Sequence, residues 1–183
     1  MNKIYLKEGK EKAVQRRHPW IFSGAIDSVL GNPTSGSLVH VYSSKKEFLG
    51  MGSFSPHSQI RIRMWSIDDE EINQEFFFHR LEDAIKKREP YKQIYNDSSW
   101  RLVYAESDRI PGLIVDQYNE ILVVQFLATG VEFFKNEIID ALIEATGILN
   151  IYERSDAEVR KLEGLPEKIG VISGLVPVFV EIN

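Results

Sequence analysis

Short runs of apolar residues, separated by residues typical of turns, occupy the first third of the chain. Their length and alternation predict strands at residues 3–6, 20–26, 38–42, 48–54 and 59–65. Polar helix formers fill residues 11–17, and Pro19 must end a helix before it. Five or six short strands at this close spacing favour a small barrel or sandwich.

The last of these predicted strands alternates strictly. Its faces carry Ile60, Ile62 and Met64 on one side and Arg61, Arg63 and Trp65 on the other. Arg61 and Arg63 would lie about 7 Å apart, close to the phosphate repeat of a single nucleic-acid strand. An ordinary solvated face of a barrel is an equal alternative. Gly50 and Gly52 interrupt the preceding strand, which favours a barrel corner over close approach by a ligand.

The pattern changes to the period of a helix after residue 72. Apolar side chains recur at helical spacing from Phe76 to Ile85, and Pro90 limits the helix, so we expect it over about residues 72–89. The acidic run at residues 68–71 suits the first turn, where carboxylates meet the positive end of the helix dipole. We interpret this segment as a connector.

Strands and helices alternate in residues 97–183. Strands are predicted at residues 101–106, 113–116, 121–127, 148–153 and 175–182. A helix over residues 131–146 ends at Gly147, and Ser155, three residues before Glu158, predicts a capped short helix. The final apolar strand needs a partner, either in this unit or in sequence absent here. The chain is therefore predicted to be α+β, a small barrel followed by a β/α unit with mixed or antiparallel strands.

Charge divides the chain near the same place. Residues 1–65 hold ten Lys or Arg and four Asp or Glu, a net +6, whereas residues 66–183 hold twelve and twenty-three, a net −11. The basic part is the natural binding site for a polyanion. The 183 residues contain no cysteine, which excludes disulfides, thiolate metal ligands and a cysteine nucleophile within this sequence. No apolar run is long enough to span a membrane, and we expect a cytoplasmic protein without a membrane partner.

The candidate chemistry concentrates in residues 9–26. Its cationic side chains are Lys10, Lys12, Arg16, Arg17 and His18. Adjacent arginines held at a corner before a proline suit phosphate recognition. Trp20 and Phe22 would either contact a base or fill the barrel, and burial is the favoured interpretation. His18 fits a turn cap and a phosphate contact equally well.

A second group of polar residues surrounds a turn. Glu106, Asp108 and Asp116 have the chemistry of a Mg²⁺ site or an acid–base pair, but turn formation around Pro111 and Gly112 is the favoured interpretation. Phosphate-binding loops, dinucleotide fingerprints and nucleophile elbows are absent, and the four histidines are scattered. The sequence therefore predicts no catalytic, cofactor-binding or metal-binding residue.

Four stretches together resemble one family of enzymes. They read GKEKAVQRRHPWIFSGAI, FLGMGSFSPHSQIRIRMW, ESDRIPGLIVDQY and YERSDAEVRKLEGL, and they span nearly the whole chain. In order and spacing they are similar to the N-terminal half of the large-subunit ribosomal RNA cytosine-C5 methyltransferases that begin with a PUA domain. The second-unit stretches are the more specific part of this resemblance.

The resemblance implies a division of the chain and a set of RNA contacts. A PUA-like RNA-binding barrel would span residues 1–68, a connecting helix and linker residues 69–96, and a central β/α domain residues 97–183. The family's Rossmann-like domain, with its S-adenosylmethionine loop and catalytic cysteine, has no counterpart here. The RNA-binding residues carried over are Lys10, Arg16, Arg17, His18, Trp20, Ser53 and Arg63.

Two hypotheses follow from these observations. In the first, the chain is the RNA-recognition portion of an S-adenosylmethionine-dependent ribosomal RNA (cytosine-C5) methyltransferase, as a fragment or a truncated relative, and catalyses nothing alone. In the second, it is a stand-alone RNA-binding or adaptor protein that uses its acidic unit for protein contacts. Ribosomal RNA is the expected partner, and the resemblance is compatible with a homodimer.

Overall fold

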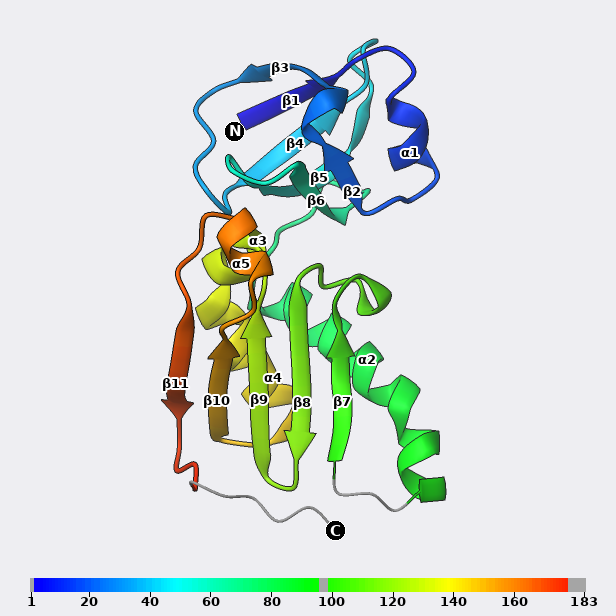
Figure 1. The fold of residues 1–183 in the computed structure, drawn as a ribbon. Helices are drawn as coiled ribbons and strands as arrows, with labels where there is room; N and C mark the ends of the chain where they lie inside the picture. Colours follow the sequence, from blue (N-terminus) through cyan, green and yellow to red (C-terminus); the bar gives the residue numbers. More distant parts are fainter. Residues whose placement is uncertain (1, 96–98, 178–183) are drawn as a thin grey trace.

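Six strands form a curled sheet in the N-terminal part of the chain, a half-barrel rather than a closed one (Figure 1). The structure is a computed structural model that describes residues 2–95 and 99–177. The strands are β1 (Asn2–Leu6), β2 (Trp20–Phe22), β3 (Ile26–Leu30), β4 (Leu38–Tyr42), β5 (Phe48–Phe54) and β6 (Ile60–Ser66). Their order is β2-β6-β5-β4-β1-β3, and every neighbouring pair is antiparallel except β1 and β4.

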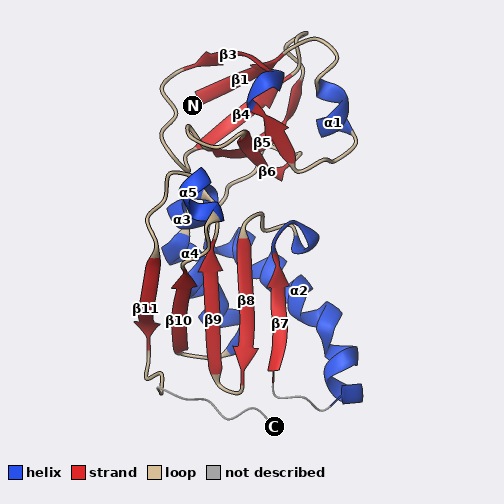
Figure 2. Cartoon of the chain, in the orientation of Figure 1, coloured by secondary structure: helices blue, strands red, loops and turns tan. Residues whose placement is uncertain are grey.

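A second sheet of five strands lies beneath the half-barrel, as the strand colours show (Figure 2). It contains β7 (Ser99–Tyr104), β8 (Leu113–Tyr118), β9 (Ile121–Phe126), β10 (Asn150–Ser155) and β11 (Lys168–Ser173). The order is β11-β10-β9-β8-β7, and only β9 and β10 run parallel among these described strands. The predicted α+β fold class is confirmed.

Helices join the strands and cover one face of the second sheet. The helices are α1 (Glu11–Gln15), α2 (Gln74–Tyr95), α3 (Thr129–Phe133), α4 (Lys135–Thr146) and α5 (Val159–Leu162), with 3₁₀ turns η1 (Ser23–Ala25) and η2 (Ala105–Asp108). In Figure 1, α2 and α4 lie behind the second sheet. Among the described residues, none of these helices is both long and apolar enough to cross a membrane.

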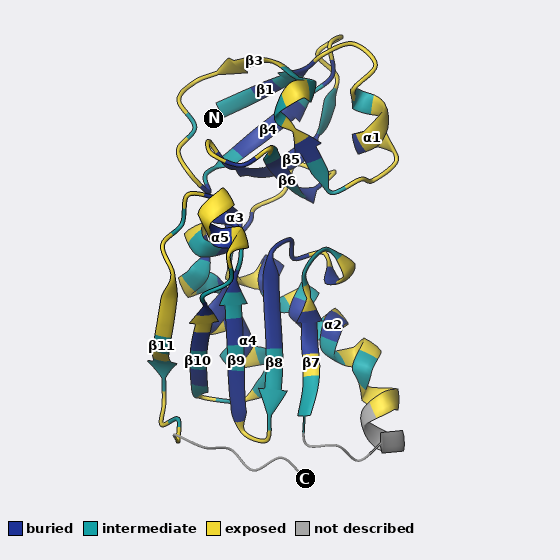
Figure 3. Cartoon of the chain, viewed as in Figure 1, coloured by how far each residue is buried: buried dark blue, intermediate teal, exposed yellow. Residues whose placement is uncertain are grey.

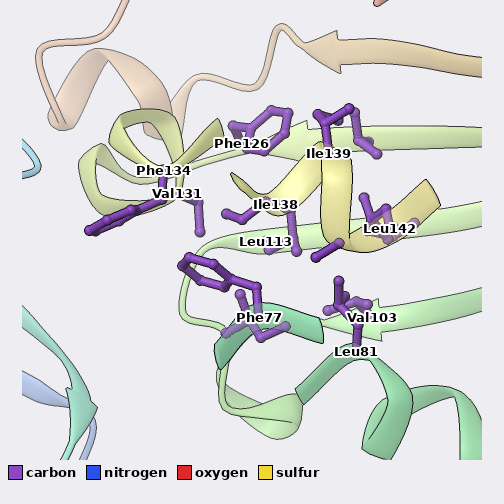
Figure 4. Close-up of a cluster of buried hydrophobic side chains, with 14 of the residues drawn as sticks. Phe77, Leu81, Val103, Leu113, Phe126, Val131, Phe134, Ile138, Ile139 and Leu142 are labelled. Carbon is purple, nitrogen blue, oxygen red and sulfur yellow. The ribbon is translucent and has the colours of Figure 1, made fainter. Parts of the chain in front are cut away.

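The larger core lies between that sheet and its helices. Figure 4 shows Phe77 and Leu81 of α2 meeting Leu142 of α4 and Leu113 of β8, and all four side chains are fully buried. Trp65 of β6 belongs to the same core. The expected connector helix therefore packs on the second sheet, and the two units share packed side chains.

This shared packing explains why the alternation of β6 misleads. One face contributes Ile62 to the small barrel core, while Arg63 and Trp65 on the other face are only 7% and 3% exposed. The second unit covers this face at Arg63 and Trp65, whereas Arg61, on the same face, is half-buried and donates a hydrogen bond within the half-barrel. Gly50 and Gly52 of β5 are needed where the backbone of β6 approaches closely. A Cβ on Gly50 would lie 2.3 Å from the Ser66 carbonyl oxygen, and a Cβ on Gly52 would lie 2.4 Å from the Arg63 carbonyl oxygen.

Four sequence expectations differ from the structure. Helix α2 continues through Pro90, whose missing N–H costs only one bond on an exposed turn. The predicted helix over residues 131–146 is divided at Phe134 into α3 and α4. Ser155 ends β10 and accepts the Phe126 N–H, so it does not cap a helix. The last described strand is β11, at Lys168–Ser173, ahead of the strand expected at residues 175–182. Residues 178–183 lie outside the described part.

Candidate nucleic-acid interface

The corner between α1 and β2 presents a group of exposed cations. Val14 is buried and anchors α1 to the barrel, and Arg17 ends the helix in the left-handed region, with φ of 62°. The Arg17 N–H donates to the Val14 carbonyl at 2.8 Å, and the His18 N–H donates to that of Ala13 at 3.0 Å. This closed turn fixes the positions of Arg16, Arg17 and His18, which are all exposed. Figure 3 colours much of the neighbouring helix α1 as exposed.

His18 caps the start of the next strand. Its Nδ1 accepts the backbone N–H of Trp20 at 3.1 Å, and its ring meets the Trp20 ring edge to face, with centroids 5.9 Å apart. His18 therefore caps the turn in this structure, and its ring is exposed at the surface.

Ion pairing divides the cations of the chain into two groups. Ten cations after residue 65 pair with a carboxylate among the described side chains: Lys86, Lys87, Arg88, Arg101, Arg109, Lys135, Arg154, Arg160, Lys161 and Lys168. In the half-barrel only Arg63 does so among the described arginines and lysines. The cations at Lys10, Arg16 and Arg17 are therefore exposed and not neutralised by the protein.

The aromatic residues of this corner are arranged differently from the expectation of burial. Ile21 points inward and is 3% exposed, whereas Phe22 is 48% exposed. Trp20 is half-buried, and its Nε1–H donates to Oε1 of Glu106 at 2.7 Å. A three-residue strand must alternate, so only Ile21 can enter the core, and Trp20 instead bridges the half-barrel to the loop after β7.

Ser53 and Arg63 lie inside the molecule, apart from the exposed corner. Nη1 of Arg63 donates to Oε1 of Glu163 at 2.7 Å, and both side chains are almost fully buried. Ser53 is 3% exposed and packs against Gly130, where a Cβ would lie 2.2 Å from the Ser53 Oγ. Of the seven predicted contacts, the structure brings Lys10, Arg16, Arg17, His18 and Trp20 together and places these two at the contact between the units.

The acidic group around η2 stabilises local structure. Asp108 is buried, accepts a two-pronged hydrogen bond from Arg88 at 3.1 and 2.6 Å, and accepts the Tyr104 N–H at 2.7 Å. Burial acts to raise the pKa of Asp108, but Arg88, the Tyr104 amide and the nearby Lys87 charge together hold the pKa below its usual value. Asp116 pairs with Arg101 on the adjacent strand. These carboxylates are already satisfied, as turn formation requires.

Among the residues that the structure describes, no three His, Asp or Glu side chains group closely enough to hold a metal ion. The missing Cβ of Gly130, in the helix that follows β9, accommodates the Ser53 and Trp65 side chains of the half-barrel.

Comparison with known proteins agrees with this two-unit arrangement. Residues 4–66 match the PUA-like domain family. Ribosomal RNA large subunit methyltransferase I of Vibrio vulnificus is 48% identical over 174 residues, and that of Tolumonas auensis is 47% identical over 175 residues. Each alignment covers 95% of this chain and 44% of the relative, so the chain spans less than half the length of these relatives.

A solved structure shows the same fold. A candidate SAM-dependent methyltransferase from Streptococcus mutans superposes with a TM-score of 0.80 over 97% of this chain and 44% of its own, at 18% identity. Residues 4–66 are thus similar to PUA-like domains, and the chain is similar, over 95% of its own length, to part of ribosomal RNA large subunit methyltransferase I of these two species.

Proposed function

We propose that this chain is the RNA-recognition portion of an S-adenosylmethionine-dependent ribosomal RNA (cytosine-C5) methyltransferase and binds structured ribosomal RNA. The observation that carries the proposal is the uneven ion pairing. Cations at the α1–β2 corner have no carboxylate partner in the described structure, while almost all described cations of the second unit do. Unpaired, exposed arginines are the groups that gain most from a phosphate backbone.

The proposed RNA surface consists of Lys10, Arg16, Arg17, His18 and the exposed edge of Trp20. Ser53 and Arg63 act in the proposal as the support of this surface, because they hold the half-barrel on the second unit. We propose the division 1–68, 69–96 and 97–183 for the barrel, the connecting segment and the central domain. Catalysis and S-adenosylmethionine binding belong to other sequence in this scheme, and the protein would act in the cytoplasm.

The test is RNA binding by wild type and by an Arg16→Ala, Arg17→Ala double variant. We expect wild type to bind a ribosomal RNA fragment with a modest salt dependence, corresponding to about two to four phosphate contacts. The double variant removes two of these contacts without touching a buried group, and a Lys45→Ala, Lys46→Ala variant on the β4–β5 turn is a matched control. Equal affinity of the arginine double variant and wild type would exclude the proposed surface.

A further inference from the structure

A cleft of about 420 Å³ lies between the half-barrel and the second unit. Arg17 and His18 line it from the α1–β2 corner, Arg80 lines it from α2, and Arg109 lines it from the loop after β7. Its size is within the range of sites that hold small ligands or single groups of a larger one. The exposed corner proposed to bind RNA is therefore one wall of a cleft, and the opposite wall is also cationic.

Arg80 is the unusual cation of the second unit. Unlike the ten paired cations, it forms no ion pair with a carboxylate among the described side chains. Its Nη2 donates to the Trp65 carbonyl at 2.6 Å, its Nη1 donates to the Arg109 carbonyl, and its guanidinium lies 4.0 Å from the Phe76 ring centroid. The side chain is thus held by two carbonyl groups and an aromatic ring, without a direct ion pair.

The electrostatics of Arg80 agree with this geometry. Burial, followed by repulsion from Arg109, lowers its pKa to about 10. A guanidinium held under both influences is stabilised by any anion that reaches it. Glu70 and Asp83 raise the pKa of Arg80, but by less than burial and Arg109 lower it.

Two arginines on opposite walls of the cleft share an uncommon backbone conformation. Arg17 and Arg109 have φ of 62° and 61°, the left-handed region that side chains with a Cβ disfavour. Each ends a short helical turn, where glycine serves the backbone best. Arg109 pairs only with Asp83, and both partners are more than half exposed, so this ion pair is weak and exchangeable. Arginine at both positions points to a use for the side chain.

The remaining lining fits a nucleotide better than a simple anion. Met64 and Pro111 contribute apolar surface, and Asp68 and Glu70 contribute exposed carboxylates. Carboxylates accept hydrogen bonds from the amino groups of bases, such as the cytosine amino group, whereas they repel a free phosphate ion. Cationic, apolar and acidic groups in one cleft match the phosphate, ring and amino group of one nucleotide.

We propose that this cleft holds one nucleotide of the bound RNA, with its phosphate on Arg17, Arg80 and Arg109 and its base against Met64 and Pro111. The inference rests on the proposed function, since it requires RNA binding, and it extends the RNA surface from the half-barrel to the second unit. It also gives Arg109, within the stretch from Glu106 to Tyr118, a role beyond turn formation.

The experiment compares Arg109→Gln with Arg154→Gln, a matched loss of an exposed, ion-paired arginine on β10, outside the cleft. The probe is a fluorescein-labelled single-stranded RNA oligonucleotide carrying cytosines, measured by fluorescence anisotropy. At about 0.1 M salt, loss of one phosphate contact weakens binding about fivefold and lowers the salt slope by about 0.7. We expect this for Arg109→Gln and no change for Arg154→Gln. Arg109→Gly, which suits the local φ, keeps the fold and gives the same loss.

The outcomes separate this inference from the proposed function. Absence of RNA binding by wild type overturns both. Binding by wild type that is unchanged in both Arg109 variants, or equally weakened in Arg154→Gln, overturns the cleft alone. The cleft proposal is also overturned if inorganic pyrophosphate displaces the RNA as effectively as cytidine monophosphate does. Crosslinking of 4-thiouridine RNA to the peptide of residues 106–111 supports the cleft, and crosslinks confined to the half-barrel contradict it.

Discussion

The buried ion pair between Arg63 and Glu163 gives the sharpest test of how the two units are held together. Its atoms lie 2.7 Å apart, and the Arg63 and Glu163 side chains are only 8% and 1% exposed. Glu163 also accepts the Thr129 N–H at 3.3 Å. Replacement of Arg63 by Met keeps much of the side-chain volume but leaves a carboxylate buried without its cation.

The cost follows from the rule for broken buried pairs. Removing one partner of such a pair typically costs about 3–5 kcal/mol, and we expect about 3 kcal/mol here because Thr129 still donates to Glu163. In a chain of this size each kcal/mol lowers the Tm by roughly 2–4 °C, so Arg63→Met should lower it by roughly 6–12 °C. The double variant Arg63→Met, Glu163→Leu removes both charges and should recover most of the loss.

Thermal and urea unfolding followed by circular dichroism measure this effect, and RNA affinity is measured in parallel below the Tm. We expect Arg63→Met to bind RNA with nearly wild-type affinity once folded. The reasoning would be refuted by a variant as stable as wild type that loses RNA affinity, because Arg63 would then contact RNA rather than Glu163. A double variant no more stable than Arg63→Met would also contradict it.

Further predictions concern packing and pH. Gly130→Ala places a Cβ against the Ser53 and Trp65 side chains of the half-barrel and should lower stability by about 1–3 kcal/mol, whereas Gly24→Ala, with open space around it, should change it little; urea unfolding measures both. Because the pKa of Asp108 is lowered in the folded protein, its ionised form stabilises the fold at pH values above the ordinary pKa of 3.8. This contribution is lost as the pH falls through the lowered pKa. Asp108→Asn should therefore be less stable at neutral pH, and its stability should depend less on acid. Ile21→Ala should cost about 2–5 kcal/mol, and Phe22→Ser less than about 0.5 kcal/mol, because only the first is buried; a Tm comparison distinguishes them.

The sequence was most informative where local chemistry decides structure. Strands β4 and β5 coincide with their predicted bounds, because turn residues delimit them on both sides. The left-handed glycine at position 147 ends α4 as predicted, since no other residue adopts φ of 71° as readily.

The interior contacts between the units could not be predicted from local pattern. Arg63 and Glu163 are separated by 100 positions, and each alone resembles an ordinary surface residue. The alternation of β6 predicted an exposed arginine face, for phosphate or for solvent, because nothing near it in sequence shows that Glu163 lies against Arg63 or that Phe77 lies against Trp65. Five of the seven predicted contacts converge on one corner because they lie within eleven consecutive residues, whose geometry a short helix and a proline control.

The uneven neutralisation of charge makes the molecule an electric dipole. Its free cations lie on the half-barrel, and its net negative charge lies on the second unit beneath it (Figure 1). In the field of a polyanion such a molecule rotates before it touches, so encounters begin with the half-barrel while the acidic end is repelled. We expect the association rate constant, rather than the dissociation rate constant, to carry most of the dependence on ionic strength.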